Sequence, residues 1–167
     1  MGASLIALGM LILTTASIWR KMERIEYSGL SAALQKLPEK PTLLGLSFYQ
    51  NSKYIRGFPF VHTVAYGQLQ RGGRINSSFA SVPFSPVVFR DTSQAWSAGL
   101  EMFPDRLRAG DLEHFTHVLV AAPAKIHRSI CSEYGLVPMA PSGRWRLYST
   151  RLTVSYESPR TIRTLVE

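Results

Sequence analysis

Residues 115–122 read FTHVLVAA, and this stretch gives the strongest indication of the fold. It is rich in β-branched and apolar residues and ends at Pro123, as expected of a β-strand. A second apolar run, TLLGLSFY at 42–49, has the length of a strand that is buried on both faces. Because helical patterns lie between and around these runs, the sequence predicts an α/β fold with parallel strands at the centre of the sheet.

Four segments around these strands show helical patterns. Most of them end at a stop signal, such as Pro38, the pair Gly72-Gly73 or Gly135. The predicted helices cover residues 28–37, with Ser28 as the N-cap, and residues 60–70, 94–103 and 125–134.

The remaining segments complete a single three-layer α/β domain over residues 28–150. Residues 136–140 and 144–150 are predicted to end the mixed sheet as an antiparallel hairpin around Pro141, Ser142 and Gly143. The other predictions are extended segments at 75–82 and 86–89, a charged loop at 105–113 and a loosely attached tail at 151–167.

Before this domain, residues 2–19 read GASLIALGMLILTTASIW and contain no charge, and Arg20 and Lys21 follow at once. As a helix this run would be about 27 Å long, close to the hydrocarbon thickness of a bilayer. We therefore expect residues 1–27 to be a single transmembrane anchor with a charged continuation. A buried helix of a soluble domain is the alternative. A cleaved signal peptide would carry a basic segment ahead of its apolar core, which is missing here.

The charge and the cysteine content limit the function further. The chain has 19 Lys and Arg against 11 Asp and Glu, a net charge of +8, which indicates anionic surroundings such as membrane lipid. The cations are scattered and form no basic run with interleaved aromatics, so nucleic acid is not an expected partner. Cys131 is the only cysteine, so no internal disulfide can form.

No complete catalytic constellation can be recognised, and we assign no catalytic residue, metal ligand or cofactor. His114 and His117 have H-x-x-H spacing, but they flank the start of a strand, where residues three apart face opposite sides. The carboxylates of Glu101, Asp111 and their neighbours are expected to be solvated charges.

The best candidate for a ligand site is the loop at 50–58 together with the RGGR turn at 71–74. The loop follows the first buried strand, and open α/β sheets place their sites at such strand ends. Its tyrosines offer faces for a sugar ring, and its arginine can bind phosphate or carboxylate. The candidate ligand-binding residues are Tyr49, Tyr54, Arg56, His62, Arg71 and Arg74. A surface loop and a helix C-cap are the structural alternatives.

Three stretches carry a family resemblance: HTVAYGQLQRGGRINSSFASVPFSPVVFR at 62–90, HFTHVLVAAP at 114–123 and SGRWRLYST at 142–150. Together they resemble the soluble C-terminal domain that follows the last membrane helix in bacterial membrane-integral, polyprenyl-phosphate-sugar-dependent (type C) glycosyltransferases. In that family the catalytic acidic residue lies in an early loop between membrane helices, a region that this chain lacks. The resemblance therefore implies a fragment or a stand-alone relative that does not transfer sugars unaided.

We therefore expect a membrane-anchored, non-catalytic domain that accompanies a polytopic glycosyltransferase and holds a sugar or sugar-phosphate ligand. The resemblance places the domain on the periplasmic side of the bacterial inner membrane, whereas Arg20, Lys21 and Arg24 favour the cytoplasm by the positive-inside rule. We expect the periplasmic side. The alternatives are a self-sufficient hydrolase using His62 or His114 with a carboxylate, and a structural module that binds a protein partner.

Overall fold

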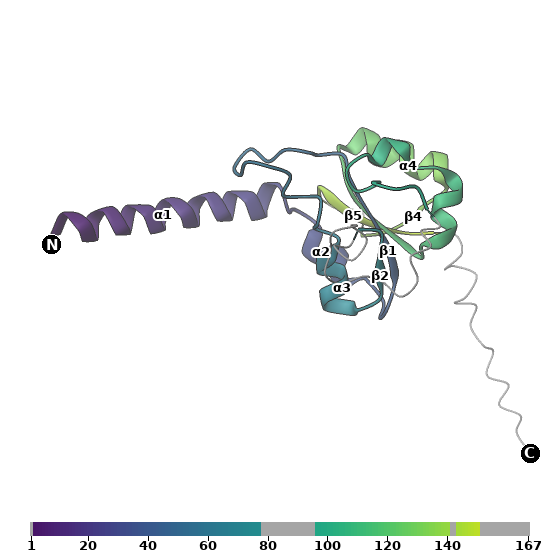
Figure 1. Ribbon diagram of the computed structural model, residues 1–167, viewed down its shortest axis with the longest axis horizontal. Coiled ribbons are helices and arrows are strands. Elements are labelled where there is room, and N and C mark those ends of the chain that lie inside the picture. The colour runs from purple at the N-terminus through teal and green to yellow at the C-terminus, as the bar shows by residue number, and fades with distance from the viewer. Residues whose placement is uncertain (1, 78–95, 141–142, 151–167) are drawn as a thin grey trace, which may run out of the picture.

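The computed structural model describes residues 2–77, 96–140 and 143–150. A long N-terminal helix, α1 (Gly2–Ile25), is followed by one α/β unit that is built on a five-stranded mixed sheet (Figure 1). The predicted fold class is therefore confirmed. The extended segment predicted at 86–89, most of that at 75–82, the tip of the hairpin at 141–142 and the tail at 151–167 lie outside the described residues.

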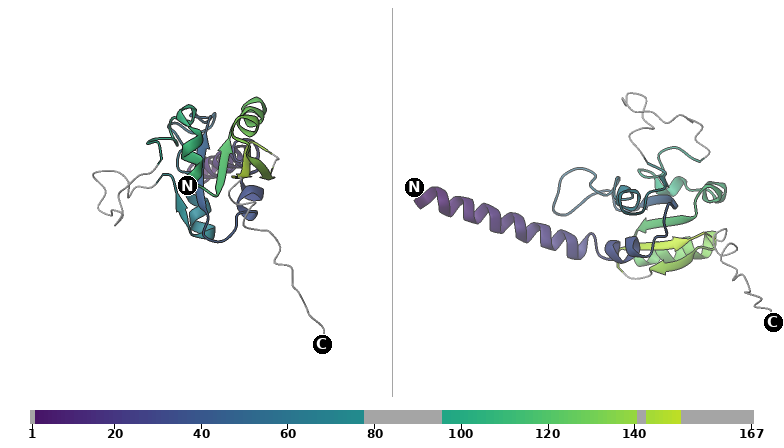
Figure 2. Two further views of the ribbon diagram at one scale, coloured as in Figure 1. Left: turned by 90° about the vertical axis from the view of Figure 1, so that its right-hand side faces the viewer. Right: turned by 90° about the horizontal axis from the view of Figure 1, so that it is seen from below.

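Helix α1 projects from the α/β unit as a separate rod (Figures 1 and 2). Within it, Ser4–Ile25 is long and apolar enough to cross a membrane, with a mean hydropathy of 1.3. Only 6% of this segment is buried, so α1 is not part of the core of the described α/β unit. By length and composition, α1 could be a membrane span or a signal sequence.

The sheet has the strand order β2-β1-β3-β5-β4. Its strands are β1 (Thr42–Ser47), β2 (Arg74–Ile75), β3 (His117–Ala121), β4 (Val137–Ala140) and β5 (Trp145–Ser149). Strand β1 is parallel to β2 and β3, while β5 is antiparallel to β3 and β4. The two apolar runs thus form the central parallel pair, and the predicted terminal hairpin is confirmed.

Helices cover both faces of this sheet. Alternate residues of the strands face opposite sides, so Leu43 packs on one face and Leu44 on the other, both fully buried. The first face is covered by α2 (Leu30–Gln35) and α3 (Ala65–Arg71). The second face is covered by α4 (Ala124–Tyr134) and the 3-10 helices η2 (Pro104–Arg106) and η3 (Ala109–His114).

Two of the predicted helix starts were wrong. Helix α2 has Gly29 and not Ser28 at its N-cap, because the chain turns sharply there and Gly29 adopts a positive φ of 85°. The hydroxyl of Ser28 instead donates to the carbonyl of Ile25 at the end of α1. Helix α3 begins at Ala65 and not at residue 60, since residues 60–64 form successive turns.

The segment between 96 and 113 also differs from the prediction. Residues 98–102 form turns and not part of a helix, because Gly99 adopts a positive φ of 73° and its carbonyl accepts both Met102 N–H and Phe103 N–H. The predicted charged loop at 105–113 is largely 3-10 helical. Within it Asp111 is buried and not solvated, and it accepts hydrogen bonds from the N–H groups of Ser97 and Arg108.

Candidate functional site

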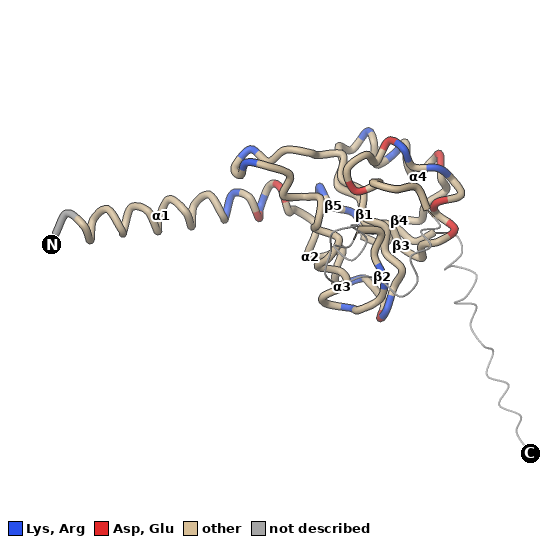
Figure 3. The backbone as a smooth tube through the Cα atoms, in the orientation of Figure 1, with Lys and Arg blue, Asp and Glu red and all other residues tan. Residues whose placement is uncertain are grey.

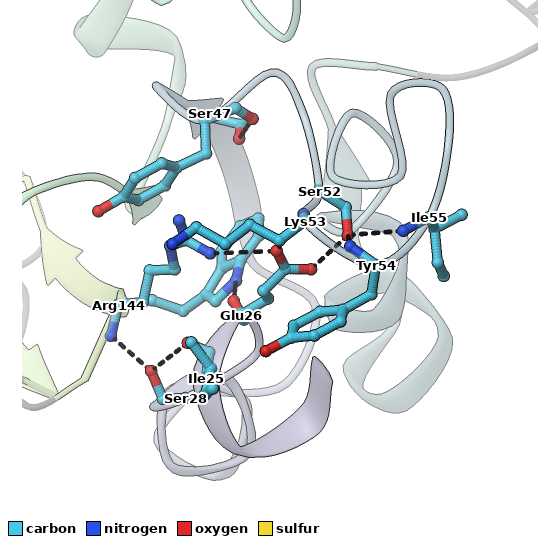
Figure 4. Close-up of polar contacts among 11 residues, drawn as sticks. Ile25, Glu26, Ser28, Ser47, Ser52, Lys53, Tyr54, Ile55 and Arg144 are labelled. Atoms are coloured by element: carbon cyan, nitrogen blue, oxygen red, sulfur yellow. Dashed lines mark hydrogen bonds and ion pairs between the residues drawn. The ribbon is translucent and has the colours of Figure 1, made fainter. Parts of the chain in front are cut away.

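Several polar contacts converge at the point where α1 enters the α/β unit. We call it the junction and define it by Glu26, Ser52, Lys53, Arg144 and Trp145 (Figure 4). It joins the end of α1 to the loop after β1 and to the start of β5. No linker separates α1 from the domain, because Glu26 follows the last residue of α1 and is only 1% exposed.

The carboxylate of Glu26 is bound on both of its oxygens. The Ser52 hydroxyl donates to Oε2 at 2.6 Å, and the Lys53 backbone N–H donates to Oε1 at 2.8 Å. The Arg144 guanidinium lies 3.9 Å from Oε1. A buried carboxylate is tolerated when its charge is paired and its lone pairs are hydrogen-bonded, and Glu26 meets both conditions.

The start of β5 completes the junction from the other side. The N–H groups of Arg144 and Trp145 both donate to the carbonyl of Ser28 at 2.9 Å. The indole N–H of Trp145 donates to the backbone carbonyl of Glu26, also at 2.9 Å. The Trp145 ring packs against Tyr27 and Phe60, with ring centroids 6.4 Å away in each case. The end of α1 is therefore held by both backbone and side-chain contacts.

These contacts are typical of a structural attachment of α1 to the domain and not of a catalytic centre. Ser52 donates its hydroxyl proton to Glu26, and its oxygen accepts the N–H groups of Tyr54 and Ile55. Its donor and both lone pairs are thus in use, so it is not an activated nucleophile. Each oxygen of the Glu26 carboxylate accepts a hydrogen bond, and the residue is only 1% exposed, so the carboxylate is shielded from solvent.

A groove lies between the last turns of α1 and the helices α2 and α3. Its volume is about 530 Å³. It combines aromatic faces with a carboxylate and an amide, and its lining residues include Trp19, Glu23, Tyr27, Leu30, Tyr66 and Gln70. The Trp19 indole N–H donates to Glu23 Oε1 at 3.1 Å. Flat apolar surfaces beside a few polar groups are typical of small-ligand sites.

No protein-family model, curated protein or solved structure matches this chain.

The structure separates the predicted ligand residues into two groups. Tyr49, Tyr54 and Arg56 lie at or near the junction, and the Arg144 guanidinium lies 3.5 Å from the centroid of the Tyr49 ring. Tyr49 is thus already used as a packing surface. Arg56 is exposed, and His62 is exposed in the turns that lead from the loop into α3.

Arg71 and Arg74 lie at the other end of the sheet. Arg74 begins β2 and pairs with Thr42 at the start of parallel β1, whereas the 50–58 loop leaves from the end of β1. Arg71 bonds to Glu39 and to the carbonyl of Gln35, which ties α3 to the segment after α2. The structure therefore does not bring the RGGR turn together with the loop.

The structure also adds residues that the sequence did not indicate. Glu26, Arg144 and Trp145 form the junction, and Glu23 and Tyr66 line the groove. Glu26 lies in the charged stretch RKMERIEY, where nothing local distinguishes it from the exposed Glu23. Among the residues that the structure describes, no group of three or more His, Cys, Asp or Glu is placed to hold a metal ion.

Helix α4 carries a buried histidine. His127 is 1% exposed; its Nε2–H donates to the carbonyl of Arg144 at 3.2 Å, and its Nδ1 accepts the hydroxyl of Tyr148 at 2.8 Å. A carbonyl can only accept and a neutral histidine has one N–H, so these contacts fix the neutral tautomer. Burial lowers the pKa of His127 and raises the pKa of Tyr148 to about 12.

This histidine predicts a pH-dependent stability. In the unfolded chain a histidine has a pKa of about 6.5, while the folded pKa of His127 is lower, so the unfolded state takes up the proton first. The contribution of neutral His127 to stability is complete above about pH 6.5 and is lost as the pH falls toward the folded pKa. Over that range the free energy of unfolding falls by no more than about 1.4 kcal/mol per pH unit. Urea unfolding between about pH 7.5 and 5.5 should show this slope in the wild type and a smaller one in His127→Gln. An equal slope in the wild type and His127→Gln would contradict this assignment.

Proposed function

We propose that the chain is a membrane-anchored, non-catalytic domain that accompanies a membrane glycosyltransferase and presents a sugar-bearing acceptor at the membrane surface. The observation that carries this proposal is the junction. A domain that only needs to stay near a membrane can hang on a flexible linker, whereas here the buried Glu26 fixes the end of α1 to the sheet. A fixed attachment is useful when one face of the domain must keep a constant orientation to the bilayer.

The groove beside Trp19 is where we expect such an acceptor to bind. Tyr66 is half exposed and Tyr27 is half buried, so their rings can stack on a sugar. Glu23 and Gln70 supply the acceptors and donors that sugar hydroxyls need. Trp19 lies at the end of the apolar run of α1, which is the depth at which a membrane lipid displays its head group.

A binding titration tests this assignment. The full chain in lipid nanodiscs is titrated with a soluble sugar phosphate, and affinity is measured for the wild type, Tyr66→Ala and Tyr54→Ala. Tyr66 lines the groove and Tyr54 does not, so we expect Tyr66→Ala to weaken binding about tenfold and Tyr54→Ala to leave it unchanged. Equal affinities in all three proteins would remove the groove as the site, and turnover of the sugar would show that the chain is an enzyme.

We also propose that the domain lies on the periplasmic side of the inner membrane. The resemblance supports this placement, while the cations that follow the apolar run oppose it. Ser129 is exposed on α4, so Ser129→Cys in a Cys131→Ser background can be labelled with a membrane-impermeant maleimide in intact cells. Labelling only after cell lysis would place the domain in the cytoplasm.

A further inference from the structure

The 50–58 loop turns back from the domain and runs beside the last turns of α1 (Figures 1 and 2). Its base is attached at the junction, where Ser52 and the N–H of Lys53 bind Glu26. The Ser52 oxygen then accepts the N–H groups of Tyr54 and Ile55, which folds the following residues into a tight turn. The loop is therefore held in place relative to α1.

The tip of the loop reaches the level of the basic turns of α1. From Glu26 back to Arg20 the helix rises about 9 Å, and an extended chain covers that distance in about three residues. The blue positions of the loop in Figure 3 lie at its tip, beside the blue turns of α1. Two segments far apart in the sequence thus place their cations at one level along the helix.

The exposed side chains at this level combine positive charge with apolar surface. Lys53 and Arg56 on the loop are exposed, as are Arg20, Lys21 and Arg24 on α1. Next to the loop cations, Phe58 is 53% exposed and Ile55 is 39% exposed. Of the two carboxylates here, Glu23 is exposed and Glu26 is buried and paired, so the net charge of the surface is strongly positive.

Cations next to exposed apolar side chains are the composition with which protein segments bind anionic bilayers, because the cations meet lipid phosphates and the apolar groups enter the interface. We propose that the 50–58 loop docks on the anionic phospholipid head groups of the bilayer that α1 enters. Phe58 and Ile55 lie in the interface, and Lys53 and Arg56 contact phosphates. The proposal rests on the proposed function only in placing α1 in the bilayer.

The test uses the full chain in liposomes of phosphatidylcholine with phosphatidylglycerol. An environment-sensitive fluorophore is attached to Phe58→Cys in a Cys131→Ser background, and quenching by head-group spin-labelled lipid is measured. The control is Val137→Cys, since Val137 is 42% exposed and pairs with Ser149, at the opposite end of β5 from the junction residue Trp145. We expect strong quenching at position 58 and little at position 137. Equal quenching at both positions would overturn the proposal.

Charge variants then test the lipid chemistry. Each cation at an anionic leaflet favours the docked state about fivefold, so Lys53→Gln with Arg56→Gln should lower the ratio of docked to undocked loop about thirtyfold. The hydrogen bond from the Lys53 backbone N–H to Glu26 is retained in this double variant. Lys125 and Arg128 on α4 are an exposed pair with the same spacing, and their Gln double variant should behave as wild type. Docking that is equally strong in pure phosphatidylcholine, or unaffected by Lys53→Gln with Arg56→Gln, would contradict the proposal.

A third label separates this proposal from the proposed function. Leu11→Cys lies in the apolar run of α1 and reports whether the helix is in the bilayer. Quenching of Leu11→Cys by acyl-chain spin labels without quenching of Phe58→Cys would leave the anchor intact and refute the docking loop. Absence of α1 from the bilayer would refute both, whereas loss of sugar binding in the groove leaves the docking result unchanged.

Discussion

Replacing Trp145 with alanine is expected to lower the free energy of unfolding of the α/β domain by about 4 kcal/mol. The Trp145 side chain is 1% exposed and packs between Tyr27 and Phe60, so its loss leaves a large cavity. The change also removes the indole N–H that binds the carbonyl of Glu26. Native-state hydrogen exchange of the β3 amides measures the effect without unfolding α1.

Two further variants calibrate this result. Trp145→Phe keeps a ring in the cavity but leaves the Glu26 carbonyl without its indole donor, so a loss of about 1–2 kcal/mol is expected. Trp19→Ala removes a tryptophan side chain that is 54% exposed, so it should lower the free energy of unfolding by no more than about 0.5 kcal/mol. If Trp19→Ala destabilised the domain as much as Trp145→Ala, the cavity explanation would be wrong.

Glu26→Ala is expected to destabilise the domain by about 3 kcal/mol. It leaves the Lys53 N–H without its acceptor and the partly buried Arg144 without its counter-ion. Exchange of the Lys53 amide should rise more than exchange in β3, because the loop loses its attachment before the sheet opens. Both quantities come from one hydrogen-exchange experiment on the full chain.

Glu23 provides the matched control for this change. It lies three residues earlier, in the last turn of α1, is exposed and accepts a hydrogen bond from the indole N–H of Trp19. Glu23→Ala should therefore change the free energy of unfolding by no more than about 0.5 kcal/mol. A loss of several kcal/mol in Glu23→Ala, or none in Glu26→Ala, would mean that the junction does not hold the domain in the way described.

The sheet was predictable because the residues of its two central strands are themselves apolar, as expected of strands that are buried on both faces. The runs at 42–49 and 115–122 are apolar, and β1 and β3 lie within them as a buried parallel pair. Helix α4 and its end at Gly135 were also predictable, since Gly135 adopts the left-handed conformation that ends a helix. These features depend on neighbouring residues along the chain.

The junction was not predictable for the opposite reason. Glu26 is buried by Ser52, Lys53 and Arg144, all distant in sequence, and no local pattern marks the pairing. The position of Arg74 likewise depends on the parallel pairing of β2 with β1, which places it at the start of β1 and away from the 50–58 loop. The ligand-binding roles of Tyr54 and Arg56 stay predictions.

For an α1 that spans a bilayer, the direct connection between α1 and the domain couples the orientation of the domain to the thickness of that bilayer. The apolar run of α1 matches a hydrocarbon layer of about 27 Å when the helix stands upright, and a thinner bilayer forces the helix to tilt. Because Glu26 and Trp145 hold the end of α1 against the sheet, the whole domain must lean through the same angle. For a spanning α1, the domain is then a rigid lever whose inclination reports the thickness of its bilayer.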